Sequence, residues 1–113
     1  MSITGAGPKP KWIGPVLHVT SISPGHSVTG KTVETTVFGT FFAKTITCEL
    51  VSGETRVPGT VSDVVTGQNS SMRVKFSLGD DIPAGLYGVE VANDAQSQST
   101  LPDAFEVRER ALA

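Results

Sequence analysis

Apolar and polar residues alternate along most of the chain with a period of two. The clearest case is SMRVKFSL (Ser71–Leu78), in which every second residue from Met72 onward is apolar and polar residues lie between. Successive side chains of a β-strand point to opposite faces, so this alternation predicts a strand with one buried face. We expect further strands of this kind over residues 16–23, 31–39, 44–51, 86–92 and 103–109.

The segment TRVPGTVSDVV, which follows the turn at Ser52-Gly53-Glu54, alternates less regularly. Pro58 has no backbone N–H, so we expect an edge strand or a broken strand there. With this segment the chain contains about seven short strands separated by turn residues, which is typical of two antiparallel sheets packed together. The sequence therefore predicts an all-β fold, an antiparallel β-sandwich of about seven strands.

The composition supports the same fold class. Valine occurs 14 times and threonine 13, against six leucines and eight alanines. β-Branched side chains suit a pleated sheet better than a helix. A chain of 113 residues fits one domain. We divide it into an extended N-terminal arm rich in Gly, Pro and Lys (1–15), a β-domain (16–108) and a short C-terminal tail (109–113).

Three stretches share their order and spacing with a known family. SISPGHSVTG has a strand that ends in Ser-Pro, followed by a loop with glycine; VETTVFGTFF is similar to V-x-I-x-G-x-x-F; and IPAGLYGVEVANDAQSQSTLPDAFEV combines Pro-x-Gly, Tyr-x-Val-x-Val, an Asn turn and Ala-Phe-x-Val. In these features the chain resembles the IPT/TIG domains of plexins, certain transcription factors and many bacterial surface proteins. The matching positions are Ile22, Pro24, Gly25, Gly30, Val37, Gly39, Phe42, Pro83, Gly85, Tyr87, Val89, Val91, Asn93, Ala104, Phe105 and Val107.

The resemblance covers about residues 15–108 and implies an immunoglobulin-like sandwich that binds or spaces other molecules. It departs at Thr35, where a larger aliphatic residue is usual, and most of all over Ser52–Ser70. Independently of the family, Tyr87 follows a glycine at the start of a strand. An immunoglobulin-type sandwich places there a tyrosine whose hydroxyl binds upstream backbone. Val89 stands where antibody domains have a cysteine, so we expect packing alone to hold the core.

Charge and hydropathy exclude two classes of partner. The net charge is −2 and the basic residues are scattered, so no basic stripe follows a nucleic-acid backbone. No apolar run approaches the roughly 20 residues that span a bilayer. MSITGAGPKPKW lacks the apolar core of a signal peptide. If Met1 is the natural start, we expect synthesis in the cytoplasm without export by that route.

The residues that carry most enzymatic chemistry are few and scattered. The sequence contains two histidines, His18 and His26, but no Gly-x-Ser-x-Gly motif with a nucleophilic serine. The sequence does not indicate a carboxylate that would orient either histidine as a catalytic base. Cys48, the only cysteine, alternates with Ile46 and Leu50 and is expected to be buried and inert. One cysteine and two distant histidines form no recognised metal-ligand spacing. We therefore predict no catalytic residue, cofactor or transition metal.

Calcium is the remaining metal to weigh. Asp80, Asp81, Asn93 and Asp94 supply the oxygen atoms that calcium prefers. The predicted strand 86–92 separates the two pairs, however, and each pair also fits an ordinary turn. We prefer the turn interpretation.

Aromatic residues give the candidate partner contacts, which are Trp12, Phe41 and Phe42. Trp12 lies in the predicted arm, where an unpacked indole leaves a large apolar area in water. It either folds back on the sandwich or inserts into a neighbouring chain. Phe41 and Phe42 are adjacent, so in a strand one ring faces the core and the other faces outward.

These observations favour a non-enzymatic structural or interaction module. The settings that we expect are a virion accessory, such as a capsid-decoration or tail-associated protein, or a spacer or adhesion domain of a bacterial surface protein. The arm and the sheet edges then dock on a protein partner by strand addition and through Trp12, and self-association stays open. The alternative is a carbohydrate-binding accessory module of a polysaccharide-active enzyme, although aromatic residues make up only 6% of the chain.

Overall fold

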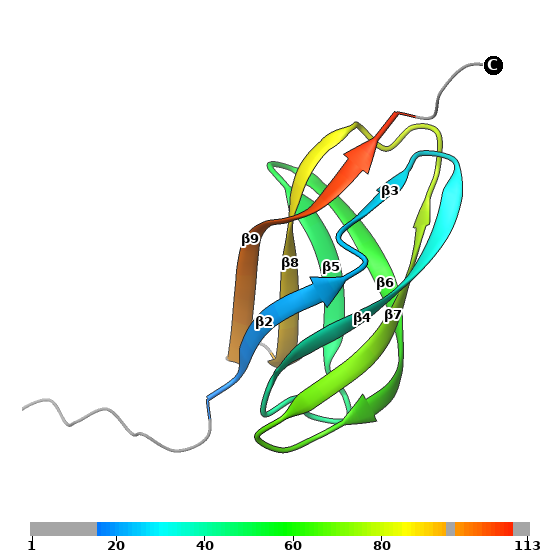
Figure 1. Cartoon of the computed structure of the whole chain (residues 1–113). Helices are drawn as coiled ribbons and strands as arrows, with labels where there is room; N and C mark the ends of the chain where they lie inside the picture. The colour runs from blue at the N-terminus through cyan, green and yellow to red at the C-terminus, as the bar shows by residue number, and fades with distance from the viewer. Residues whose placement is uncertain (1–15, 95–96, 110–113) are drawn as a thin grey trace, which may run out of the picture.

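The structure is a computed structural model that describes residues 16–94 and 97–109. The described residues form eight β-strands and no helix, which confirms the all-β fold class. The strands are β2 (His18–Ser23), β3 (His26–Val28), β4 (Lys31–Thr40), β5 (Thr47–Ser52), β6 (Thr55–Val65), β7 (Ser70–Leu78), β8 (Gly85–Asp94) and β9 (Ser97–Arg108) (Figure 1).

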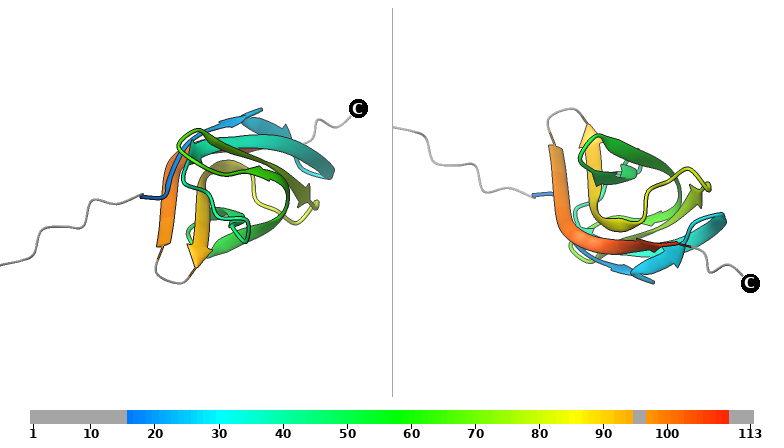
Figure 2. Two further views of the ribbon diagram at one scale, coloured as in Figure 1. Left: turned by 90° about the horizontal axis from the view of Figure 1, so that it is seen from below. Right: turned by 90° about the horizontal axis from the view of Figure 1, so that it is seen from above.

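The eight strands are hydrogen-bonded into one sheet, in the order β2-β4-β7-β6-β5-β8-β9-β3. Neighbouring strands are antiparallel except β3 and β9, which are parallel. The sheet curls until β2 approaches β9, where the backbone N–H of Val19 donates a hydrogen bond to Oγ of Ser99 at 3.1 Å. Seen along its long axis, the sheet surrounds the core like a barrel that is nearly closed (Figure 2).

The continuous sheet differs from the two separate sheets that we expected, and the strands number eight rather than about seven. The additional strand, β3, consists of three residues just after the Pro24-Gly25 turn. Continuity comes from β6, which pairs with β5 up to Pro58 and with β7 from Gly59 onward. Pro58 lacks an N–H and cannot continue the first ladder. It therefore marks a change of neighbour within one long strand rather than a break.

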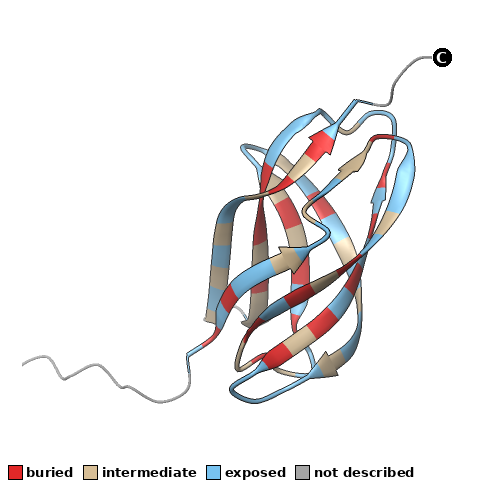
Figure 3. Cartoon of the chain, viewed as in Figure 1, coloured by how far each residue is buried: buried red, intermediate tan, exposed pale blue. Residues whose placement is uncertain are grey.

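Buried residues alternate with more exposed ones along the strands and form the core (Figure 3). The alternating apolar residues of β7 are buried, as are Tyr87, Val89 and Val91 of β8. Thr35 of β4 is also buried, and its Oγ1 donates a hydrogen bond to the carbonyl of Val74 at 2.9 Å. The expected inward faces of these strands are therefore confirmed, and the buried hydroxyl of Thr35 has a partner.

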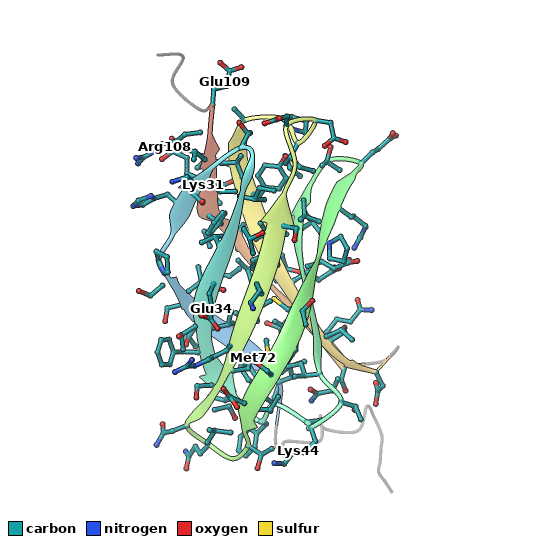
Figure 4. All side chains as sticks on the ribbon, turned by 90° about the vertical axis from the view of Figure 1, so that its right-hand side faces the viewer. Lys31, Glu34, Lys44, Met72, Arg108 and Glu109 are labelled. Atoms are coloured by element: carbon teal, nitrogen blue, oxygen red, sulfur yellow. The ribbon has the colours of Figure 1, made fainter. Side chains whose placement is uncertain are left out.

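The molecule has a lower end and an upper end in the view of Figure 1. The lower end contains the start of β2, the loop 41–46 and the turn 66–69, and the upper end contains the loop 79–84 and the end of β9. Figure 4 gives the same orientation from the side, with Lys44 at the lower end and Glu109 at the upper end.

Candidate functional site

Three large apolar side chains are exposed on the outer surface of the sheet toward the lower end. They are Val16, Phe38 and Val65, which are 50, 42 and 52% exposed. Among the other described residues, only Leu86, near the upper end, is a large apolar residue exposed to this degree, at 55%. Single exposed apolar residues are ordinary, but a cluster marks a surface that binds something. We call Val16, Phe38 and Val65 the outer apolar patch.

Strand register places two members of the patch on either side of Ser71. Phe38 of β4 and Val65 of β6 both pair with Ser71 of β7. Residues that lie directly opposite each other share one face of a sheet. The side chain of Ser71 is smaller than those of its two neighbours on this face. Figure 4 shows β4, β7 and β6 side by side on this surface.

A β-bulge in β6 puts Val65 on the outer face. Ser62 keeps the regular pairing with β7, but the next pairing, of Val65 with Ser71, is shifted by one residue. Asp63 lies between them with a positive φ of 52°. A regular register would set Val64 opposite Ser71, whereas in the structure Val64 packs against the core. A shift of one residue exchanges the two faces of a strand, so the bulge exposes Val65.

Val16 is held next to Thr40, the last residue of β4, by a hydrogen bond. Oγ1 of Thr40 donates a hydrogen bond to the carbonyl of Val16 at 3.0 Å, and His18 pairs with Thr40 in the ladder of β2 and β4. Thr40 is two residues beyond Phe38 and therefore lies on the same face. The described chain thus begins beside the patch.

A shallow cavity of about 300 Å³ adjoins the ring of Phe38. Its other lining residues are Thr20, Gly39, Asn69, Ser70 and Ser71. Small-ligand sites are lined mainly by apolar and aromatic side chains, whereas this cavity has one aromatic ring and several polar groups, and its volume is near the lower limit for such a site.

Phe41 and Phe42 lie in the loop after β4, between the two segments, 31–39 and 44–51, over which strands were expected. Phe41 has a positive φ of 57°, which ends the extended conformation. Asn93 holds the loop with two hydrogen bonds: Nδ2 donates to the carbonyl of Phe41 at 3.0 Å, and Oδ1 accepts from the N–H of Ala43 at 2.9 Å. The N–H of Phe41 also donates to the carbonyl of Gly67 at 2.7 Å.

The ring of Phe42 lies in the core and is 2% exposed. Gly39 leaves room for it, since a Cβ atom at that position would overlap the ring. Phe42 therefore has almost no surface to offer a partner, whereas Phe41 is half-buried at the lower end. Trp12, the third predicted contact, lies outside the described residues.

The sequence analysis did not single out Val16 or Val65. The available signal for Val65 was the pair Val64-Val65, because adjacent residues of a strand cannot both face the core. Which of the two faces outward depends on the bulge at Asp63, and the sequence pattern alone does not fix it.

The four candidate calcium ligands are divided between the two ends of β8, as their spacing predicts. Asp80 and Asp81 precede β8 in the upper loop, and Asn93 and Asp94 end it. The Asn93 amide binds the loop after β4, and Oδ1 of Asp94 accepts from the N–H of Ser97 at 2.9 Å. The described residues contain no group of three or more His, Cys, Asp or Glu side chains placed to hold a metal ion.

The histidines and the cysteine lie on different strands. His18 and His26 are exposed on β2 and β3, and Cys48 is buried in β5. Burial raises the pKa of the Cys48 thiol from 9.0 to about 12, and the negative charge of Glu49 adds to the rise. A thiol with this pKa stays protonated near neutral pH and is a poor nucleophile.

The outer surface of β5, β6 and β8 carries a cluster of three charges. Glu49 and Glu90 lie directly opposite each other, and Nη1 of Arg56 binds Oε1 of both, at 2.6 and 2.8 Å. The hydrogen bond to Glu90, followed by the one to Glu49, raises the pKa of Arg56. Like charges in opposed positions destabilise a sheet, and Arg56 offsets their repulsion. A groove of about 500 Å³ adjoins the cluster, and these charges on its wall are already paired within the protein.

No helix among the described residues is long and apolar enough to cross a membrane. No family model matches the chain, and no curated protein matches its sequence.

Proposed function

We propose that this protein is a non-enzymatic interaction module that docks on a protein partner through its lower end. The docking elements are residues 1–15 with Trp12, the outer apolar patch and the half-buried ring of Phe41. The partner is a capsid, tail or bacterial surface assembly, in which the module serves as a decoration, a spacer or an adhesion domain. Its place is then a virion or a cell surface.

The observation that carries this proposal is the position of the outer apolar patch. Three of the four large exposed apolar side chains of the described residues lie toward the lower end, and one of them, Val16, is the first described residue after residues 1–15. The segment 1–15 contains the only tryptophan of the chain. Aromatic anchors and apolar patches are the features that distinguish the core of a protein interface from ordinary surface.

We infer further that the fold is an immunoglobulin-like sandwich of the IPT/TIG type. In support, β6 divides the sheet into one half with β2, β4 and β7 and another with β5, β8, β9 and β3. The hydroxyl of Tyr87 donates a hydrogen bond to the carbonyl of Pro83 at 2.7 Å, the return bond of a tyrosine corner. Val89, at the cysteine position of antibody domains, is fully buried.

Co-sedimentation with purified virions or cell envelopes from the source of the protein tests the proposed function. The full chain is expected to sediment with one of these assemblies, and a chain without residues 1–13 is expected to stay in the supernatant. Leu86→Ser, at the upper end, is the matched control and should bind like the full chain. Equal binding by the shortened chain, or no binding by the full chain, overturns the proposal.

A second candidate function, carbohydrate binding, is favoured by the cavity beside Phe38. The ring and the polar groups of Thr20, Asn69 and Ser71 are arranged around it. A glycan array probed with the full chain and with Phe38→Ala separates the two functions. Binding that Phe38→Ala abolishes supports a sugar site, and an array without signal removes this candidate.

A further inference from the structure

Strand β6 changes its neighbour at Pro58 and leaves one of its two edges free beyond that point. Its ladder with β5 ends where Pro58 lies opposite Glu49. Its ladder with β7, on the other side of the strand, begins at Gly59. After Pro58 no other described strand pairs with the side of β6 that faces β5. The free edge runs through residues 59–62, up to the bulge that contains Asp63.

Strand β5 has a free edge at the same place. Thr47 and Cys48 pair with β8 on one side, whereas the ladder with β6 on the other side begins only at Glu49. β5 starts and β6 ends at the lower end of the molecule, so the gap between the two free edges opens toward that end (Figure 1). We call the gap between Thr47-Cys48 and residues 59–62 the β5–β6 fork.

The groove of about 500 Å³ beside the charge cluster lies in this fork. Its lining includes Cys48 on the β5 side and Gly59 on the β6 side. A hollow of this volume is within the range of sites that hold a ligand. The unpaired N–H and C=O groups of a strand edge are a template for one further strand, and the backbone of an extended peptide supplies the matching groups. The fork therefore combines a hollow with the backbone groups that hold a peptide in it.

The side chains beside the fork determine which peptide fits. Toward the core, Cys48 is buried and Val61 packs against the hydrophobic cluster, so an inward-facing residue of an added strand has to be apolar. On the outer face, Glu49, Glu90 and Arg56 line the groove. Two carboxylates and one guanidinium leave this group with a net charge of −1. The charge favours a basic side chain at the outward-facing positions of the peptide.

We propose that the β5–β6 fork binds an extended segment of a partner protein, which adds a strand to residues 59–62 and directs a lysine or arginine toward Glu49 and Glu90. Pro58, which has no N–H, and the bulge at Asp63 limit the added ladder to the length of this edge. The segment alternates apolar and polar residues, because its two faces meet the core and the charge cluster.

This inference rests on the proposed function in one respect, which is that the occupant belongs to a protein partner. It is tested with a synthetic peptide, whereas the proposed function is tested by co-sedimentation with an assembly. Peptide binding in the fork without co-sedimentation removes the proposed docking and leaves the fork in place. Co-sedimentation without peptide binding does the reverse.

Amide hydrogen exchange and chemical shifts, measured by NMR on the full chain, report on the fork. In the protein alone, the amide hydrogens of residues 59–62 that point into the fork should exchange rapidly, because no ladder protects them. The probe is the acetylated and amidated peptide Thr-Val-Lys-Val-Thr-Val-Thr. At millimolar concentration it should slow this exchange severalfold. It should also shift the amide resonances of residues 59–62, Thr47 and Cys48, while that of Leu86 stays in place.

Two control peptides separate the contributions of backbone and charge. A peptide of the same sequence with methyl groups on all its backbone nitrogens cannot donate to a strand edge and should cause neither effect. A peptide with glutamate in place of lysine should bind several times more weakly, because it brings a third carboxylate to Glu49 and Glu90.

Protein variants test the charge from the other side. Glu90→Gln should weaken binding of the lysine peptide about twofold to fivefold at low ionic strength, the effect of one exposed ion pair. Glu34→Gln is the matched control, since Glu34 is exposed on β4, away from the fork, and it should leave the affinity unchanged. Circular dichroism verifies that both variants are folded.

The proposal is overturned if the lysine peptide neither shifts nor protects residues 59–62, or if the methylated peptide binds equally well. Protection of these amides in the protein alone that increases with protein concentration also overturns it, because a second copy then occupies the fork. Equal affinity of the wild type and Glu90→Gln contradicts the basic side chain that we assign to the peptide.

Discussion

The side-chain amide of Asn93 holds Phe42 in place by binding the backbone on both sides of it. Nδ2 donates to the carbonyl of Phe41, and Oδ1 accepts from the N–H of Ala43, so the two peptide groups that flank Phe42 are tied to the end of β8. These bonds cross from the loop after β4 to a strand about 50 residues further along the chain. They fix the position from which the ring of Phe42 enters the core.

Asn93→Ala removes both hydrogen bonds and is expected to destabilise the fold. A hydrogen bond contributes about 0.5–1.5 kcal/mol net, so we expect a loss of about 1–3 kcal/mol in the free energy of unfolding. Urea denaturation followed by circular dichroism measures it. Asn69→Ala, in the exposed turn at the same end, is the control and should change the free energy by less than about 0.5 kcal/mol. Equal effects of the two substitutions would mean that the two hydrogen bonds of Asn93 contribute nothing to the free energy of unfolding.

Tyr87→Phe isolates the hydroxyl that binds the carbonyl of Pro83 at 2.7 Å. The ring is buried and stays in place, so the substitution removes only the hydrogen bond to the carbonyl of Pro83, at a cost of about 1 kcal/mol. Thermal denaturation should show a lower melting temperature. Tyr87→Leu also removes ring packing and should lower it further. An unchanged melting temperature for Tyr87→Phe rules out a stabilising role of the hydroxyl at this corner.

Period-two alternation predicted those strands that keep one face buried along their whole length. β7 and β8 bury alternate residues, so their inward faces follow from the sequence alone. The sequence did not predict β3, because a strand of three residues is too short to show an alternation and because its partner, β9, lies about 80 residues away in the chain. The interpretation of Pro58 was half right, since it does interrupt a ladder, but the strand continues by pairing with β7.

The site was less predictable because its geometry depends on backbone details. Phe41 follows β4 with a positive φ, so both phenylalanines lie in a loop, where the argument that adjacent residues of a strand face opposite sides does not apply. The sequence predicted that Asn93 lies at a turn, and Asn93 does lie at the end of β8. A turn pattern does not indicate, however, that the side chain of Asn93 binds a loop about 50 residues away. Val65 is exposed through the bulge at Asp63, which no alternation pattern contains.

Gly59→Ala tests the point at which β6 exchanges neighbours. A Cβ atom there would overlap the side chains of Val74 and Phe76, both fully buried. Adding a methyl group to a packed core costs about 1–3 kcal/mol. Gly88→Ala is the matched control, because the nearest atom to its Cβ is 3.4 Å away, an ordinary contact. Urea denaturation should show a large loss for Gly59→Ala and a small change for Gly88→Ala; the reverse order contradicts the packing at Gly59.

Cys48 makes the stability of the fold depend on alkaline pH. Burial raises the pKa of its thiol from 9.0 to about 12 in the folded chain, while the unfolded chain exposes the thiol to water. Below pH 9 the thiol is protonated in both states. As the pH rises from about 9 to about 12, only the unfolded chain releases the proton, so the free energy of unfolding falls by about 1.4 kcal/mol per pH unit.

Comparing the wild type with Cys48→Ala isolates this contribution from the other groups that titrate in alkali. The difference in the free energy of unfolding between the two proteins should stay constant below about pH 8 and shift by about 2 kcal/mol against the wild type by about pH 10.5. Urea denaturation at a series of pH values measures this difference, and iodoacetamide labelling should modify Cys48 only after unfolding. A difference that stays flat to pH 11, or rapid labelling of the folded chain, shows that the thiol is accessible to water and contradicts its burial between β6 and β8.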